Sequence, residues 1–213
     1  MNFVSRIDPQ NWIPFRLKKE TSLWARQYGY IAGVDEAGCG PLAGPVVAAA
    51  VIFSPFFYIE QVNDSKKLTE QKREEMYAVI LDNAVSYGIG IVSHVEIDKI
   101  NIRQATFKAM RMALGSLKKQ PDYVIFDGYE LPERFFAQEH IIDGDELCFT
   151  IAAASIIAKV TRDRMMIDLH MQYPQYGFDH HKGYATAHHR RMVREHGPCP
   201  IHRKTFLKKI ISS

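Results

Sequence analysis

Two adjacent carboxylates, Asp35 and Glu36, follow a short apolar run and stand directly before a glycine-rich turn. Carboxylates at the mouth of a buried strand are costly unless cations or hydrogen bonds compensate them, and hard oxygen ligands of this kind suit Mg²⁺ or Mn²⁺. Gly38, Gly40 and Gly44 allow the backbone to approach a ligand closely and to turn N–H groups toward an anion. A metal site beside a phosphate site indicates phosphoryl transfer.

Either half of this pattern alone is weak, because Asp-Glu pairs usually lie on solvated surfaces and Gly-Pro clusters usually mark hairpin turns. The combination is more informative. Residues 31–34 lead into the acids and residues 46–53 leave the turn as a second apolar run, which predicts an antiparallel strand pair. Successive side chains of a strand point to opposite faces, so Asp35 and Glu36 can share a site only where the strand ends or bends.

Asp127 repeats the pattern of Asp35, since it ends a short apolar strand over residues 123–126 and precedes Gly128. Ligands of open α/β sheets gather outside strand ends, so the two aspartates are predicted to converge. An isolated Asp-Gly more often just begins a turn.

A long buried helix is predicted over residues 150–168, where alanine and isoleucine dominate. Ser155, Lys159 and Asp163 are spaced four apart and therefore share one ridge of this helix. They form either a simple Lys159–Asp163 pair or a polar ridge aimed at the carboxylates, with Asp163 as a fourth acid.

The remaining pattern indicates an α/β protein. Thr69 caps a helix that extends to about residue 83, residues 84–93 alternate as a strand does, and residues 100–119 are helix-like. Strands interleaved with helices indicate an α/β sheet, and the first strand pair adds an antiparallel element to it.

Length and composition allow one large domain, or a core with an appendage, because the 213 residues are 46% hydrophobic. The three cysteines are odd in number and widely separated, which indicates reduced thiols in a cytoplasmic protein. We find no signal peptide and no apolar run of membrane-spanning length, so no membrane partner is expected.

The charge is distributed unevenly. The chain carries +3, but residues 181–213 carry +7, which leaves −4 for the other 180 residues. An acidic core with a basic tail is expected where the tail meets a polyanion that the core modifies, although a merely solvated basic helix is the simpler alternative.

Five segments together resemble bacterial ribonuclease HII, in that family's order and over most of the chain. The related ribonuclease HIII has an extra N-terminal domain, for which the 29 residues before Tyr30 are too few, and a different glycine-loop sequence. The segments are Asp35-Glu-Ala-Gly-Cys-Gly-Pro-Leu-Ala-Gly-Pro45, Asp64-Ser-Lys-Lys-Leu68, Asp127-Gly128, Ala154-Ser-Ile-Ile-Ala-Lys-Val-Thr-Arg-Asp163 and His181-Lys-Gly-Tyr184.

The resemblance implies a ribonuclease H-like mixed sheet flanked by helices, in a single catalytic domain. An N-terminal segment (1–29) would precede the core (about 30–172), and a basic helical extension (about 173–213) would bind substrate. The implied activity is hydrolysis of the RNA strand of RNA/DNA hybrids and incision 5′ to single ribonucleotides in duplex DNA, leaving 5′-phosphate and 3′-hydroxyl ends. Two Mn²⁺ or Mg²⁺ ions would serve, held by the four acids that match the family's catalytic set: Asp35, Glu36, Asp127 and Asp163.

The resemblance also implies substrate contacts. Gly38, Cys39 and Gly40 would contact the backbone and 2′-hydroxyl at the cleaved position, Lys66 would contact phosphate, and Tyr184 would sense the ribonucleotide–deoxyribonucleotide junction. Many relatives have arginine where this chain has Cys39, so a guanidinium–phosphate contact is lost there while backbone contacts can persist. We expect Cys39 to be a small packed residue rather than a reactive thiol.

His180, His181, His188 and His189 lack zinc-protease spacing and are expected to be surface histidines near nucleic acid. Two rival functions stay open. A hybrid-binding module would not need four acids, and a nuclease acting on DNA alone is disfavoured only through the resemblance. The enzyme is expected to act as a monomer.

Overall fold

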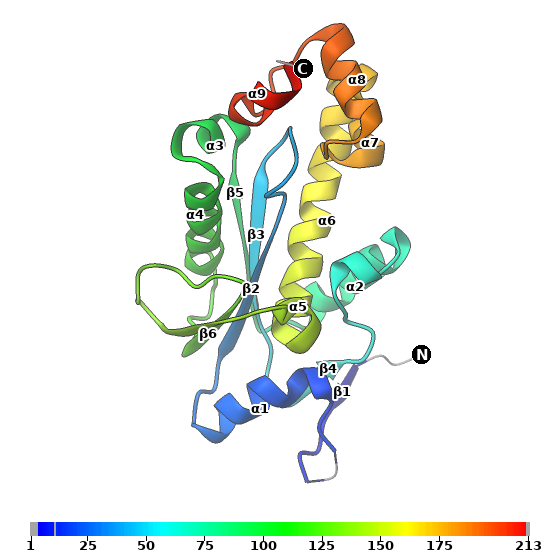
Figure 1. The fold of residues 1–213 in the computed structure, drawn as a ribbon. Helices are drawn as coiled ribbons and strands as arrows, with labels where there is room; N and C mark the ends of the chain where they lie inside the picture. The colour runs from blue at the N-terminus through cyan, green and yellow to red at the C-terminus, as the bar shows by residue number, and fades with distance from the viewer. Residues whose placement is uncertain (1–3, 11, 212–213) are drawn as a thin grey trace.

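The computed structural model describes residues 4–10 and 12–211, with side chains to residue 207. Strands alternate with helices through most of the chain, as Figure 1 shows. The strands are β1 (Val4–Arg6), β2 (Ile31–Ala37), β3 (Val46–Ile52), β4 (Phe57–Ile59), β5 (Ser86–Val92), β6 (Tyr123–Asp127) and β7 (Ala137–Ile141). The helices are α1 (Lys18–Ala25), α2 (Glu70–Asn83), α3 (His94–Ile100), α4 (Ile102–Gly115), α5 (Gly144–Leu147), α6 (Phe149–Gln172), α7 (Phe178–His181), α8 (Ala187–His196) and α9 (Lys204–Ile211), with 3₁₀ turns at Phe15–Leu17, Ser65–Lys67 and Pro174–Tyr176.

The main sheet is mixed and has the strand order β5-β3-β2-β6-β7. The pairs β2–β3 and β3–β5 are antiparallel, whereas β2–β6 and β6–β7 are parallel. This confirms the predicted fold class and the predicted antiparallel pair around the glycine-rich turn. The parallel β2–β6 pair brings the carboxyl ends of β2 and β6 to the same edge of the sheet, where Asp35 and Asp127 stand.

Helices cover both faces of the sheet, so every residue of β3 is buried. Ala48, Ala50 and Ile52 pack with α4 on one face. Ala49 and Val51 belong to the core that α2 and α6 complete on the other face. In Figure 1, α4 and the long α6 stand on opposite sides of the central strands.

The C-terminal helices gather at one end of the molecule, beyond the end of α6 (Figure 1). Tyr176, Phe178 and Val193 form a small core there with Leu42 and Met166. The chain after α6 therefore packs against the glycine-rich turn. Of the predicted basic tail, the side chains of Lys208 and Lys209 and residues 212–213 lie outside the described part.

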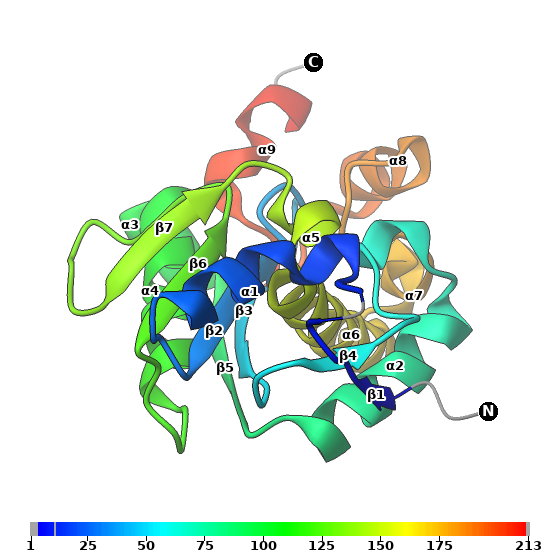
Figure 2. The same cartoon turned by 90° about the horizontal axis from the view of Figure 1, so that it is seen from below.

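The N-terminal segment supports the opposite end of α6, seen from below in Figure 2. Glu20 of α1 is fully buried and accepts hydrogen bonds from both the N–H and the hydroxyl of Thr150, each at 2.9 Å. A carboxylate there satisfies free N–H groups of the first turn of α6. Burial raises the pKa of Glu20 to about 7, although these hydrogen bonds oppose the rise.

Some expected boundaries were wrong. The helix expected over residues 100–119 starts earlier as α3 and breaks at Asn101, whose φ is 67° and whose side chain caps α4. Strand β7 and the β1–β4 pair were not predicted. Among the described residues, no helix combines the length and apolar character needed to cross a membrane.

Candidate active site

Three aspartates from separate elements meet at the edge of the sheet. Asp35 lies near the end of β2, Asp127 ends β6, and Asp145 lies in the short helix α5 that follows β7. One carboxylate oxygen from each lies within 4.8 Å of the other two. The convergence of Asp35 and Asp127 agrees with the strand-end argument, whereas Asp145 was missed.

Asp35 faces α6 and is held by hydrogen bonds on that side. Its carboxylate accepts from the N–H of Glu36 at 2.6 Å and from the Ser155 hydroxyl. Ser155 in turn contacts the hydroxyl of Ser65 at 2.8 Å. This series of hydrogen bonds ties Asp35 to α6 and to the segment before α2.

Glu36 points to the other face of β2, toward α4. The thiol of Cys39 lies 3.5 Å from its Oε1 and 3.3 Å from the hydroxyl of Thr106. Glu36 still lines the same cleft as Asp35, because both stand close to the end of the strand. Successive side chains of a strand point to opposite faces, but Asp35 and Glu36 can still line one cleft because they stand near the end of β2.

Asp127 and Asp145 are fixed by hydrogen bonds from neighbouring segments. Asp127 accepts from the N–H of Gly144 at 2.7 Å, which links β6 to the start of α5. Asp145 is buried and accepts from Lys66 Nζ at 3.1 Å. The hydrogen bond and charge of Asp145 raise the pKa of Lys66, although desolvation opposes the rise.

The clustered acids raise one another's pKa. Burial, with the charges of Glu36 and Asp127, raises the pKa of Asp35 well above its ordinary value. Burial and the charge of Asp145 raise the pKa of Asp127, and burial and Asp127 raise that of Glu36. Carboxylates gathered this closely have the donor chemistry of a divalent-cation site.

Asp163 does not reach this group. Its two carboxylate oxygens each accept a hydrogen bond from Lys159 Nζ at 2.6 Å, one turn earlier on α6, and the side chain is buried. Of the polar ridge, Ser155 and Lys159 line the cleft, whereas Asp163 does not. From Ser155 to Asp163 an α-helix rises about 12 Å, which carries the aspartate past the cluster.

A cleft of about 200 Å³ opens beside the carboxylates and brings together the glycine-loop residues, Lys66 and Tyr184, for which a substrate contact was predicted. It is lined by Gly38, Cys39, Gly40, Lys66 and Tyr184, together with Asp35, Glu36 and Asp127. Tyr184 is 44% exposed and lies beside Gly40, where an added Cβ would be 3.9 Å from its ring. Each of the five segments singled out in the sequence thus contributes at least one residue to this single cleft.

The turn at residues 38–45, which we call the glycine loop, requires glycine at Gly38. Its φ is 97°, and a Cβ there would lie 2.1 Å from Arg162 Nε. Cys39 packs toward Thr106 and Glu36, and burial raises the pKa of its thiol to about 12. That environment disfavours a thiolate and agrees with a packing role for Cys39.

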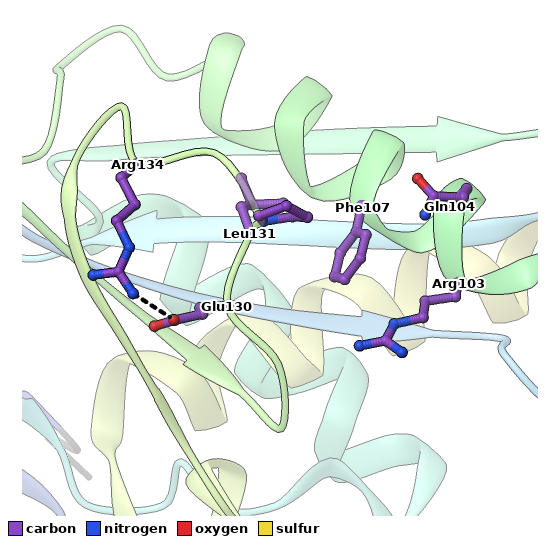
Figure 3. Close-up of a pocket in the computed structure, with 7 residues that line it drawn as sticks. Arg103, Gln104, Phe107, Glu130, Leu131 and Arg134 are labelled. Carbon is purple, nitrogen blue, oxygen red and sulfur yellow. Dashed lines mark hydrogen bonds and ion pairs between the residues drawn. The ribbon is translucent and has the colours of Figure 1, made fainter.

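Two hollows along α4 are lined by Arg103. One of about 250 Å³ starts at Glu36 and Cys39 and is lined by Arg103 and Tyr129. A larger one of about 430 Å³ continues past Arg103, where Figure 3 shows Arg134 paired with Glu130. The larger hollow holds none of the clustered acids, so the chemistry is assigned to the smaller cleft beside them.

The histidines belong mainly to the C-terminal core. His189 is fully buried, which corrects the expectation of a surface residue. Its Nδ1 lies 2.9 Å from the carbonyl of Tyr184, and its Nε2 lies 3.0 Å from Nε2 of His202. Since His202 Nδ1 accepts from the N–H of Cys199, His202 must donate through Nε2 and both rings are neutral.

This pair predicts acid sensitivity. Burial lowers the pKa of both His189 and His202 to about 4 from the ordinary 6.5. Between those pH values the unfolded chain binds more protons, so stability is present above pH 6.5 and is lost as the pH falls toward 4. The loss is on the order of 3 kcal/mol for each histidine.

Thermal unfolding of wild type and His202→Gln between pH 7.5 and 4.5 would measure the effect. The variant should be less stable at pH 7.5 but lose less on acidification than wild type. Parallel pH profiles for the two proteins would contradict the assignment.

A mixed sheet between helices, with carboxylates gathered where its strands end and a phosphate-sized cleft beside them, defines a ribonuclease H-like, metal-dependent nuclease. The family model for Ribonuclease HII matches residues 32–209. Ribonuclease HII of Acetivibrio thermocellus is 52% identical over 90% of this chain and 75% of its own length. That of Caldicellulosiruptor saccharolyticus is 50% identical over 90% and 94%.

Solved structures agree. Ribonuclease H2 from Pyrococcus horikoshii superposes with a TM-score of 0.73 at 28% identity, over 86% of this chain and 97% of that one. Bst-RNase HIII in complex with Mn²⁺ has a TM-score of 0.65 at 18% identity, over 89% and 72%, which shows the shared fold. The chain belongs to the ribonuclease HII family. It is a metal-dependent endoribonuclease that cleaves the RNA strand of RNA/DNA hybrids.

Proposed function

We propose that this enzyme also incises duplex DNA on the 5′ side of a single embedded ribonucleotide, using two divalent cations and leaving 5′-phosphate and 3′-hydroxyl ends. The observation that carries the proposal is the joint placement of the acid cluster, the glycine loop and Tyr184 around one cleft. The cluster supplies metal-dependent hydrolysis. The loop and the tyrosine supply a surface that can read one sugar.

The acids that fit the cations are Asp35, Glu36, Asp127 and Asp145. Burial and neighbouring negative charges raise the pKa of Asp35 and of Asp127, and Mn²⁺ or Mg²⁺ would relieve that concentration of charge. Two such ions would activate a water and stabilise the charge on the departing 3′-oxygen. The Mn²⁺ complex of a ribonuclease HIII of the same fold supports a divalent cation at this site.

The residues of the chain bind and orient the substrate. The glycine loop offers the N–H groups of Cys39 and Gly40 to a phosphate, and Lys66 adds a positive charge at the rim of the cleft. Tyr184 presents an aromatic face that can stack on a sugar or base next to the cut. These contacts position one strand without reading a base sequence.

We assign residues 173–213 to a substrate-binding extension of a single catalytic domain, acting as a monomer. Val193 of its basic helix α8 packs in one core with Leu42 of the glycine loop, which supports this assignment. Cys39, Cys148 and Cys199 are free, which agrees with a reducing compartment such as the cytoplasm.

The test uses a labelled DNA duplex containing one ribonucleotide, beside an all-DNA duplex of the same sequence, with Mg²⁺, Mn²⁺ or chelator. Metal-dependent cutting only on the 5′ side of the ribonucleotide is expected. Cutting of the all-DNA duplex would indicate a general DNA nuclease, and binding without cutting would indicate a hybrid-binding module.

Tyr184→Ala should lower the cleavage rate at a lone ribonucleotide by about 10- to 100-fold, because stacking contributes about 1–3 kcal/mol. Binding of the duplex should weaken less than cleavage, since phosphate contacts remain. Tyr87 is a matched control, because it is 42% exposed on β5 and lies outside the cleft. Equal losses in binding and cleavage would indicate that Tyr184 only packs.

A further inference from the structure

Two buried guanidinium groups lie behind the glycine loop. Arg162 of α6 is 1% exposed, and Arg203, just before α9, is fully buried. Both donate only to backbone carbonyls in the hydrogen bonds found among the described residues. Arg203 binds the carbonyls of Gly38, Cys39, Gly44 and Pro45, and Arg162 binds those of Ala43, Pro45 and Lys182.

These two charges have no carboxylate in an ion pair within the part of the chain that the structure describes. Burial, together with the charge of Arg162, lowers the pKa of Arg203 to about 9, and burial lowers that of Arg162. An unpaired buried charge is unfavourable for folding, even when carbonyl dipoles solvate it. A stability cost of this kind is expected where the charge serves a site.

The hydrogen bonds to Arg203 fix the direction of two peptide groups. Arg203 holds the carbonyls of Gly38 and Cys39, at 2.7 and 3.2 Å. In a planar trans peptide the N–H points opposite to the carbonyl, so the N–H groups of Cys39 and Gly40 point away from the guanidinium. Neither donates to another described group, and both residues line the cleft.

Arg162 joins the glycine loop to the segment that carries Tyr184. One of its nitrogens donates to the carbonyl of Pro45 and another to that of Lys182, each at 3.0 Å. Its guanidinium also lies 5.9 Å from the centre of the Tyr184 ring. Arg162 therefore ties the glycine loop to the segment before Tyr184, in addition to the 2.8 Å hydrogen bond from Leu42 N–H to the carbonyl of Gly183.

We propose that Arg162 and Arg203 are positioning residues for ribonucleotide recognition: they hold the glycine loop and Tyr184 in one arrangement and leave their positive charge to be balanced by the substrate phosphate. This inference rests on the proposed function, because it takes the loop and the tyrosine as the substrate contacts. Neither arginine touches the acid cluster. Their loss should therefore affect substrate binding and sugar discrimination more than the chemical step.

The experiment compares Arg203→Gln, Arg203→Lys and Arg162→Lys with wild type. Tyr176→Phe is the control, since it keeps the ring in the C-terminal core and removes only the hydroxyl, whose 2.7 Å hydrogen bond goes to the carbonyl of Gly197 and not to the glycine loop. For each folded protein, kcat and KM are measured on the single-ribonucleotide duplex. Dissociation constants for that duplex and its all-DNA counterpart are measured with Ca²⁺ in place of the catalytic ion.

Arg203→Gln should raise KM by about 10- to 100-fold, because hydrogen bonds from a charged group that set the loop are lost, while kcat falls less. The preference for the ribonucleotide duplex should shrink by a similar factor. The lysine variants keep the positive charge but lose the planar guanidinium group and its several N–H donors. We therefore expect smaller changes in the same direction. Tyr176→Phe should lose thermal stability while keeping KM and the preference.

If Arg203→Gln does not fold, the two lysine variants decide the question. Folded variants that keep both KM and the preference within about twofold of wild type would overturn the proposal. A control that changes in parallel with the arginine variants would do the same, because the effect would then be general destabilisation. Failure of wild type to incise at the ribonucleotide would instead refute the proposed function.

Discussion

Asp35→Asn should reduce cleavage of RNA/DNA hybrids by about a thousandfold or more, since it removes a charged ligand from the centre of the acid cluster. The fold should persist, because an amide oxygen can still accept the hydrogen bonds from Glu36 N–H and Ser155 that the carboxylate accepts now. Initial rates with Mg²⁺ and with Mn²⁺ measure the loss. Asp82→Asn on the exposed face of α2 is the control and should cleave like wild type.

The same variant separates stability from activity. Without metal, Asp35→Asn should melt at or above the wild-type temperature, because burial and like charges make the ionised aspartate unfavourable. Mn²⁺ should raise the melting temperature of wild type and do so much less for the variant. A variant that cleaves at a comparable rate would remove the metal model.

Asp145→Asn should also abolish most cleavage, by about a hundredfold or more, because Asp145 completes the group with Asp35 and Asp127. Asp163→Asn should lower cleavage less than about tenfold and cost about 1–3 kcal/mol of stability, since it leaves Lys159 without its charged partner in a half-buried position. Parallel rate and melting measurements on the two variants compare these roles directly. Loss of cleavage in Asp163→Asn alone would restore Asp163 as the fourth acid.

The aspartates of the cluster show what the sequence could predict and what it could not. Asp35 and Asp127 each end an uninterrupted apolar run, so the strand-end argument placed them correctly. Asp145 follows β7, an edge strand whose sequence Ala-Gln-Glu-His-Ile lacks such a run, so the strand was not predicted and neither was the acid after it. The signal that was available is the step Asp143-Gly144, which resembles Asp127-Gly128 and stands directly before Asp145.

Asp163 was expected beside the other acids because helical periodicity shows which face of a helix a residue lies on. Periodicity does not show whether a residue's position along the helix axis is level with a particular site. Spacing by four puts Ser155 and Asp163 on one ridge, yet two turns separate them along the axis. The buried pair of His189 and His202 could likewise not be predicted from local sequence periodicity, since it depends on how α8 packs against the segment before α9. Contacts between distant segments leave little trace in local periodicity.

The sequence pattern was most reliable where both faces of an element are covered. Strand β3 is apolar at every position and was placed within one residue, whereas the α3–α4 break depends on a single residue with positive φ, Asn101. The substrate contacts were inferred from family likeness, and the structure gathers Gly38, Lys66 and Tyr184 at one cleft although they are far apart in sequence.

Direct measurement of Mn²⁺ binding tests, without reference to turnover, whether Asp35, Glu36, Asp127 and Asp145 hold the catalytic cations. Titration of metal-free protein, followed by calorimetry or by the loss of the free Mn²⁺ resonance signal, would compare wild type, Asp145→Asn and Asp163→Asn. Asp145→Asn is expected to weaken binding by about tenfold or more, whereas Asp163→Asn should bind like wild type. Wild-type affinity in Asp145→Asn, with loss of binding in Asp163→Asn, would contradict this assignment of the ligands.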